Sequence, residues 1–285
     1  MQAVSAMEGS TGRALDVVHT YHRWYDEFPT VVERTLIGSG HQLFTNWEPT
    51  NRDGSPMSWA SIANGDHDAE IDALAARLRG LPPILLSFSH EPELDYGVHG
   101  RAEDFAAAFR RVWERLHQDG VSNVRYVWNV MGLMTSVWLG RYPDLWPGAQ
   151  YVDWVAWDPY NWATCRPRPW QSFDQTIGPF YDWLEKQGWG DKPFMLGEYG
   201  TVEKADDPAG KSGWLASIPA TLAKFPNLRA LIYFDLNAPP ANCDWAIDTS
   251  TASAAAFAQL ARSPEFHVTT SPPTMPSLGS TPVRS

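Results

Sequence analysis

Two glutamates lie close to the ends of apolar segments, and their carboxyl groups could serve a hydrolase. Residues 84–91 read ILLSFSHE and residues 194–200 read FMLGEYG, so each apolar run ends by presenting a glutamate, Glu91 or Glu198. Two carboxyl groups facing one glycosidic bond can hydrolyse it, standing about 5–5.5 Å apart in retaining enzymes and about 6.5–9.5 Å apart in inverting ones. Ion pairs with loop Arg or Lys side chains are the alternative role for each glutamate.

Other catalytic motifs are incomplete. His90-Glu91 begins the zinc-protease pattern His-Glu-x-x-His, but Leu94 stands where the second histidine belongs. Gly38-Ser39-Gly40 begins a dinucleotide-binding pattern, but Leu43 replaces its last glycine. The chain also lacks the Gly-x-Ser-x-Gly elbow of a serine hydrolase. We therefore expect neither a metal site nor a cofactor.

Apolar strand-like segments alternate with amphipathic helical segments, and this alternation predicts a parallel α/β fold. Because no phosphate-binding turn is present, the pattern favours a (β/α)8 TIM barrel over a doubly wound sheet, with both glutamates at the carboxyl ends of strands where barrels place their active sites. We expect strands at 14–19, within 35–44, and at 84–88, 124–130, 151–157, 194–196 and 229–234, and helices at 66–79, 102–119, 173–187, 213–225 and 252–261.

These segments supply seven strands, whereas a barrel needs eight. Residues 1–13 read as the end of a helix and a turn, so we expect the first strand to be missing from this chain and the barrel to be open. The alternative is that residues 2–6 are an irregular remnant of that strand. An open barrel leaves two strand edges uncovered.

The length of 285 residues and its apolar content suit one catalytic domain, which we place at 1–263. Residues 264–285 are rich in Pro, Ser and Thr, which predicts a linker or disordered tail of the kind that leads to another module. A formal net charge of -11 argues against nucleic acid or an anionic membrane surface as partner. No run is long enough for a membrane helix, and the N-terminus lacks the apolar core of a signal peptide.

The most unusual feature of the composition is the aromatic content, because the chain contains 15 tryptophans. Several lie beside Asn, Asp, Pro or Gly in expected loops, where flat rings next to hydrogen-bonding groups suit sugar rings. Packing beneath long loops is the alternative for each. These tryptophans are Trp47, Trp59, Trp146, Trp162, Trp170 and Trp245.

The two cysteines, Cys165 and Cys243, both fall in loop-like sequence after expected strands. A disulfide joining two loops on the same face and two free buried thiols are both compatible with this placement.

Three segments together resemble glycoside hydrolase family 26: SFSHEPE (87–93), YPDLWPGAQYVDWVAWDPYNW (142–162) and KPFMLGEYG (192–200). The resemblance extends from about Ala14 to Ala261. It implies a retaining (β/α)8-barrel enzyme, most members of the family being endo-β-1,4-mannanases. By position it makes Glu91 the general acid/base and Glu198 the nucleophile.

The same resemblance implies further roles around these two carboxyl groups. His90 matches a ligand of the sugar in the −1 subsite, Tyr160 matches the tyrosine that hydrogen-bonds the nucleophile, and Trp162 would form a wall of the cleft. Asp158 is a candidate substrate ligand, although in Trp-Asp-Pro-Tyr it is equally suited to fixing the turn before Pro159. Trp47 is a further candidate sugar contact.

The chain departs from the mannanase pattern at two places. Pro92-Glu93-Leu94 replaces the common Met-Asn-Gly, and the last strand carries Tyr233 and Phe234 where a tryptophan is common. Mannan is therefore the expected substrate, with mixed-linkage β-glucan and a non-catalytic carbohydrate-binding barrel as alternatives. The resemblance also implies an extracellular protein that acts on a polysaccharide or oligosaccharide as a monomer, with a carbohydrate-binding module as a candidate neighbour beyond the tail.

Overall fold

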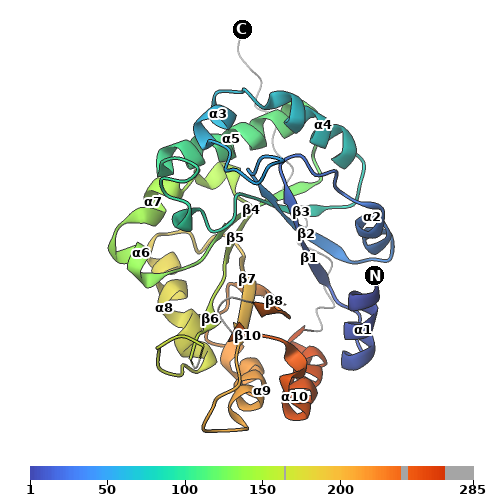
Figure 1. The fold of residues 1–285 in the computed structure, drawn as a ribbon, viewed down its shortest axis with the longest axis vertical. Coiled ribbons are helices and arrows are strands. Elements are labelled where there is room, and N and C mark those ends of the chain that lie inside the picture. Colours follow the sequence, from blue (N-terminus) through green and yellow to red (C-terminus); the bar gives the residue numbers. More distant parts are fainter. Residues whose placement is uncertain (164, 239–242, 267–285) are drawn as a thin grey trace.

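The computed structural model describes residues 1–163, 165–238 and 243–266, and its centre is one parallel sheet. The strands follow the order β1-β2-β3-β4-β5-β7-β6, and β8 also pairs with β7. Helices surround this curved sheet on its outer side (Figure 1). The strands are β1 (Val17–Arg23), β2 (Gln42–Glu48), β3 (Ile84–Phe88), β4 (Val124–Val130), β5 (Trp154–Trp157), β6 (Tyr160–Asn161), β7 (Phe194–Thr201) and β8 (Leu228–Tyr233).

Every pairing within this sheet is parallel, so the carboxyl ends of its strands meet at one side of the molecule. β6 has two residues and lies against the end of β7, whereas the other seven strands build the barrel wall. The described residues contain no backbone pairing between β8 and β1. The predicted (β/α)8-type barrel is confirmed, and the described residues leave it open between β8 and β1.

The helices precede or follow these strands as an α/β barrel requires. They are α1 (Gln2–Thr11), α2 (Val31–Gly38), α3 (Trp59–Ala63), α4 (Asp68–Leu78), α5 (Ala102–Gln118), α6 (Met134–Trp138), α7 (Arg141–Leu145), α8 (Phe173–Lys186), α9 (Gly210–Leu222) and α10 (Thr251–Ala261). Helix α5 illustrates how the sequence specifies a helix and its end. One face of α5 is a buried apolar stripe formed by Phe105, Phe109, Val112 and Leu116. Gly120 follows the helix with a φ of 76°, which suits glycine.

Two apolar cores lie on the two faces of the barrel wall, because side chains alternate along each strand. The barrel interior is filled by Phe44, Leu85, Val127, Ala156 and Met195, with Val17, Ala230 and Ile232 partly buried beside them. A larger cluster between the wall and the helices includes Leu43, Leu86, Trp128, Trp157 and Leu196. This packing holds the strand ends, and the side chains they carry, in fixed positions.

The main errors of the strand prediction lie near residues 31–44 and 194–201. A strand was expected within residues 35–44, and β2 does start there at Gln42, but it runs on to Glu48. Residues 35–38 belong instead to helix α2, whose capping box joins Thr30 and Glu33. Strand β7 was expected to stop at residue 196, yet it continues to Thr201 because Gly200 and Thr201 pair with β6. Glu198 therefore lies inside a strand rather than after one.

The smaller elements lie at the rim and after the last strand. A two-stranded antiparallel ribbon joins β9 (Asn237–Ala238) and β10 (Cys243–Asp244). Residues 264–266 form a 3-10 turn after α10, and the rest of the predicted tail lies outside the described residues. None of the described helices combines the length and hydrophobicity needed to cross a membrane.

Candidate active site

Polar side chains gather where the barrel strands end. Glu198 lies near the end of β7, Tyr160 is in β6 beside it, and Asp158 follows β5 directly. Glu91 follows β3 after two further residues, and Tyr21 points inward from the second half of β1. This is the side of a parallel barrel at which active sites are found.

Glu198 is buried, with 8% of its surface exposed, and its two carboxylate oxygens have different partners. The hydroxyl of Tyr21 donates to Oε1 over 2.5 Å. The hydroxyl of Tyr160 donates to Oε2 in a short hydrogen bond. Burial raises the pKa of both tyrosines, and so does the nearby charge of Glu198, so both hydroxyls stay protonated at neutral pH and stabilise an anionic Glu198.

Asp158 fixes the backbone at the same place. Its Oδ1 accepts a hydrogen bond of 2.8 Å from the backbone amide of Glu198, and its Oδ2 accepts one of 3.1 Å from Asn129 Nδ2. A Cβ on Gly197 would lie 2.7 Å from Asp158 Oδ1, so glycine is required for this close approach. Complete burial and the charges of Glu198 and Glu91 raise the pKa of Asp158 well above its usual value.

Glu91 is presented by a turn with unusual backbone angles. Ser89 and Glu91 have φ values of 50° and 52°, in the left-handed region that non-glycine residues rarely adopt. The turn is held by hydrogen bonds from the Glu91 amide to Asn129 O (3.0 Å) and from the Trp59 indole to Ser89 Oγ (3.0 Å). Backbone strain that the surrounding structure maintains in this way is typical of functional sites.

The environment of Glu91 favours its protonated form. Burial raises the pKa of Glu91 to about 7; the positive charge of His90 opposes the rise, and the negative charges of Glu198 and Glu93 add to it. A carboxyl group with a pKa near neutrality can give and take a proton within one reaction cycle.

His90 lies between Glu91 and Glu48, the last residue of β2. Its Nδ1 makes a short contact with Glu48 Oε1, and its backbone amide lies 3.3 Å from the same oxygen. Burial lowers the pKa of His90, but the carboxylate of Glu48 outweighs it and raises this pKa to about 10. His90 is therefore an imidazolium at neutral pH. Beside it is a recess of about 260 Å³, lined by Glu48, Thr50, His90, Glu91, Leu94, Asp95 and His99.

Glu93, which replaces the asparagine of the common mannanase pattern, is buried and makes structural hydrogen bonds. Its Oε1 accepts hydrogen bonds from Tyr142 Oη (2.6 Å) and from the backbone amide of Gly132 (3.1 Å). Burial raises the pKa of Glu93 to about 7. This carboxyl group ties the turn that carries Glu91 to the loop after β4 and does not point into the recess beside His90.

Trp162 and Trp47, two predicted sugar contacts, lie in different surroundings. Trp162 is half-buried at the rim and packs edge-on against Trp245, with the guanidinium of Arg166 5.3 Å from its ring centre. Trp47 is 1% exposed and stacks on Trp24 with ring centres 3.9 Å apart. Its expected place in the cleft is corrected, because a ring covered on both sides offers no face to a sugar.

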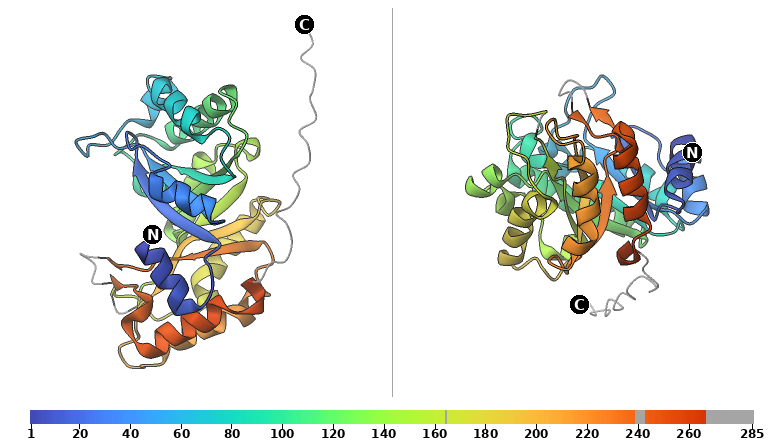
Figure 2. Two further views of the ribbon diagram at one scale, coloured as in Figure 1. Left: turned by 90° about the vertical axis from the view of Figure 1, so that its right-hand side faces the viewer. Right: turned by 90° about the horizontal axis from the view of Figure 1, so that it is seen from below.

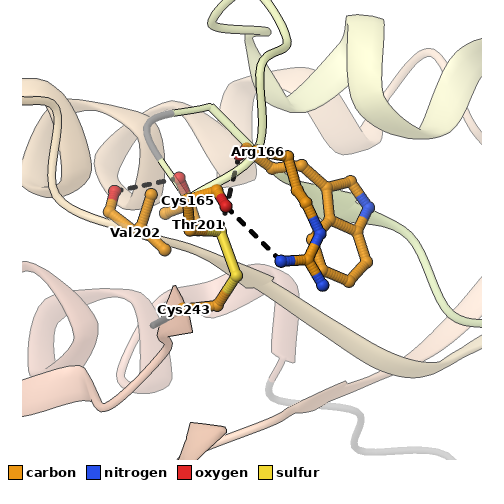
Figure 3. Close-up of a disulfide and its surroundings, with 6 residues drawn as sticks. Cys165, Arg166, Thr201, Val202 and Cys243 are labelled. Carbon is orange, nitrogen blue, oxygen red and sulfur yellow. Dashed lines mark hydrogen bonds between the residues drawn. A yellow bond between two sulfur atoms is a disulfide. The ribbon is translucent and has the colours of Figure 1, made fainter. Parts of the chain in front are cut away.

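Cys165 and Cys243 form a disulfide across 78 residues, which decides between the two alternatives left by the sequence. It joins the loop after β6 to the ribbon after β8, next to Thr201 and Val202 of the β7 end (Figure 3). Cys243 packs with Tyr160, Val202 and Trp245. The disulfide therefore fixes the rim around Tyr160.

Tyr21 is a site residue that the sequence did not reveal, because the first expected strand ended at residue 19. The structure extends β1 to Arg23, and 44% of the Tyr21 surface is exposed although its hydroxyl points to Glu198. At the last strand, Tyr233 Oη donates to Thr201 O over 3.4 Å, and Phe234 meets Tyr160 edge-on. The described residues contain no group of three His, Cys, Asp or Glu side chains arranged to hold a metal ion.

The strand order defines an open (β/α)8-barrel architecture, with carboxyl groups gathered where its strands end. The fold is similar to a GH26 β-mannanase from Bacteroides ovatus, with a TM-score of 0.62 and 18% identity over 91% of this chain and 82% of that one. It is also similar to the catalytic domain of an endo-β-1,4-mannanase from Bacillus sp. JAMB-750, with a TM-score of 0.58 and 15% identity over 92% of this chain and 89% of that one. The resemblance to glycoside hydrolase family 26 is thus confirmed at the level of the fold.

In sequence, the chain is 29% identical over 273 residues to Endoglucanase H of Acetivibrio thermocellus. This match covers 90% of the chain but 28% of that protein, so the chain spans little more than a quarter of its relative. No family model matches the chain.

Proposed function

We propose that this chain is a retaining endo-β-glycanase, with β-1,4-mannan as its first candidate substrate. The observation that carries the proposal is the contrast between two carboxyl groups at the strand ends. Glu198 is buried with a tyrosine hydroxyl on each oxygen, whereas burial raises the pKa of Glu91 to about 7. Glu198 thus has a hydrogen-bond donor on each oxygen, as a nucleophilic carboxylate needs, and Glu91 is suited to carrying a proton.

The proposed reaction has two steps. In the first, Glu198 attacks the anomeric carbon while Glu91 donates its proton to the leaving oxygen, so the glycosidic bond breaks and a glycosyl ester on Glu198 forms. In the second, Glu91 takes a proton from water, which attacks the same carbon and releases Glu198. The hydroxyls of Tyr21 and Tyr160 hold the carboxylate of Glu198 in position for both steps.

Mixed-linkage β-glucan is the second candidate substrate. The relative that is 29% identical bears the name Endoglucanase H, whereas the similar structures named mannanases are 13–18% identical. Pro92-Glu93-Leu94 and the pair Tyr233-Phe234 also depart from the mannanase pattern. Leu94 lines the recess beside Glu91, and Phe234 meets Tyr160 edge-on, so each difference includes a residue beside the proposed −1 subsite. In that subsite the orientation of the sugar's 2-hydroxyl distinguishes mannose from glucose.

We also propose that the protein works outside the cell. The disulfide between Cys165 and Cys243 supports this, because disulfides persist in oxidising compartments.

The test is product release from mannan, glucomannan, mixed-linkage β-glucan and xylan, measured by chromatography with Glu198→Ala alongside. We expect a ladder of oligosaccharides from one polymer and none with the variant. Added azide should restore turnover to Glu198→Ala as a glycosyl azide of inverted configuration, which is the signature of a lost nucleophile. Sugar binding without product from the parent protein would instead indicate a carbohydrate-binding barrel.

A further inference from the structure

His19 is a titratable residue of β1 that the proposed reaction does not use, although it lies directly beside Tyr21. Side chains alternate along a strand, so His19 and Tyr21 project from the same face of β1. Their ring centres are 4.4 Å apart, and Nδ1 of His19 lies 3.2 Å from the hydroxyl oxygen of Tyr21. The imidazole therefore contacts the hydroxyl that donates to Glu198. β1 runs along one side of the barrel (Figure 2).

The imidazole of His19 is neutral at neutral pH. Burial and the positive charge of His90 lower the pKa of His19 to about 3, although the side chain of Asn46 and the backbone of Gly197 act in the opposite direction. A neutral imidazole carries a single N–H, either on Nδ1 or on Nε2, and its other nitrogen can only accept.

The hydroxyl of Tyr21 determines which nitrogen carries that proton. This hydroxyl has one proton, which it donates to Oε1 of Glu198 over 2.5 Å. Its oxygen can therefore only accept a hydrogen bond from His19, so Nδ1 must be the protonated nitrogen. The other tautomer would place two lone pairs against each other over 3.2 Å.

The two tyrosines that meet Glu198 are held in place differently. Tyr160 is 7% exposed and packs against the rings of three aromatic side chains, whereas 44% of the Tyr21 surface is exposed. In the described part of the chain, the ring of Tyr21 has two ring neighbours, His19 and His90. The orientation of Tyr21 therefore depends on few contacts, and His19 provides one to its ring and one to its hydroxyl.

His19 is itself fixed by the barrel interior. It pairs in register with Phe44 of β2, which is fully buried. The two rings stack with their centres 4.1 Å apart and their planes at 19°. The position of Nδ1 thus follows from the packing of the core and not from the mobility of an exposed side chain.

We propose that His19 is a positioning residue of the active site, which donates its Nδ1–H to the hydroxyl of Tyr21 and thereby holds that hydroxyl on Oε1 of Glu198. This inference rests on the proposed role of Glu198 as the nucleophile. Hydrogen bonds in series polarise one another, so the bond from His19 also makes Tyr21 a stronger donor. No proton is transferred along the series, since each donor keeps its hydrogen.

Two variants separate this hydrogen bond from the packing of the ring. His19→Leu keeps an apolar side chain against Phe44 and removes the donor, whereas His19→Asn places an amide nitrogen near the position of Nδ1 and loses most of the packing. We expect His19→Leu to lower kcat by about 2- to 10-fold, and His19→Asn to retain more of the parent kcat. The reverse order would overturn the proposal, because it is the order that packing alone predicts.

A double-mutant cycle tests whether His19 acts through Tyr21. When Tyr21→Phe has removed the hydroxyl, His19→Leu should change kcat by less than about twofold. In the Tyr160→Phe protein, where the hydroxyl of Tyr21 remains, His19→Leu should keep its full effect. An equal effect of His19→Leu in both proteins would overturn the proposal.

A measurement that needs no turnover tests the tautomer. In the parent protein with 15N-labelled histidine, long-range proton–nitrogen NMR spectra at pH 7 should show a neutral His19 ring protonated at Nδ1, assigned by its absence in His19→Asn. A ring protonated at Nε2 in a protein that hydrolyses a polymer would overturn the role of His19 alone. The Nδ1–H tautomer in a protein that releases no product from any polymer would overturn the proposed function but support the hydrogen bond to Tyr21.

Discussion

The hydroxyl of Tyr21 lies 2.5 Å from Oε1 of Glu198, although 177 positions separate the two residues. Tyr160 holds the other oxygen, so neither oxygen of this carboxylate depends on water alone. A hydrogen bond to a charged group contributes about 1.5–3 kcal/mol. Tyr21 therefore belongs to the proposed active site as closely as Tyr160 does.

We expect Tyr21→Phe to lower kcat by about 10- to 100-fold, since about 1.5–3 kcal/mol corresponds to that factor. Tyr160→Phe is the matched variant on the other oxygen and should have an effect of similar size. The measurement is steady-state kinetics on the polymer identified by the product screen. A Tyr21→Phe enzyme with the parent kcat would show that this hydroxyl leaves Glu198 when substrate binds.

The pH profile of kcat/KM should fall on its alkaline side near pH 7, where Glu91 loses its proton. Glu48→Gln removes the anion that keeps His90 charged, and the cation of His90 lowers the pKa of Glu91. Without that cation the pKa of Glu91 rises, so the alkaline limb should move to higher pH. If the pH at which kcat/KM falls on the alkaline side did not change, while activity dropped at all pH values, Glu48 would have only a structural role in the site.

Stability at low pH should depend on Glu33, a buried residue at the start of α2. Burial raises its pKa, but hydrogen bonds from His22 and from the backbone of Thr30 outweigh this and lower the pKa to about 2. A depressed pKa stabilises the fold above the unfolded value of about 4.3, and this stabilisation is lost as pH falls toward 2. Urea melts should show Glu33→Gln to be less stable at pH 7 by about 1.5–3 kcal/mol. The difference from the parent should shrink on acidification, and a constant difference would contradict this account.

Removing the disulfide should destabilise the rim. Replacing Cys165 and Cys243 together by serine should lower the free energy of unfolding by about 2–4 kcal/mol, because the disulfide restricts a long loop of the unfolded chain. Denaturant titration of the parent and of the double variant measures this difference in the free energy of unfolding. A reductant should lower the stability of the parent to that of the double variant and leave the variant unchanged; a reductant effect on the variant would point to another cause.

Much of the barrel was readable from sequence because its signals are local. Glu91 and Glu198 were singled out because each lies close to the end of an apolar run. Residues 84–88 and 124–130 have the predicted strand bounds. A strand was expected within residues 35–44, but residues 35–38 end helix α2, whose capping box at Thr30 and Glu33 was not recognised, and β2 starts only at Gln42.

The remaining features depend on contacts between distant residues. Trp47 has loop-like neighbours in sequence, but it lies in β2 and its ring is covered by Trp24. Tyr21 is assigned to the site only by its distance to Glu198, and no local pattern encodes that distance. The pairing of β6 with the end of β7 likewise follows from tertiary structure, and it moves Glu198 inside a strand.

Gly197 limits how far this scaffold can be redesigned. Even alanine at this position would bring its Cβ to 2.7 Å from Asp158 Oδ1 and 2.8 Å from Asn129 Oδ1, so any replacement displaces the groups that fix the backbone of Glu198. A combinatorial library aimed at new substrates should therefore keep position 197 invariant. Diversity is better placed at Leu94 and Val98, whose exposed side chains can change without such a clash.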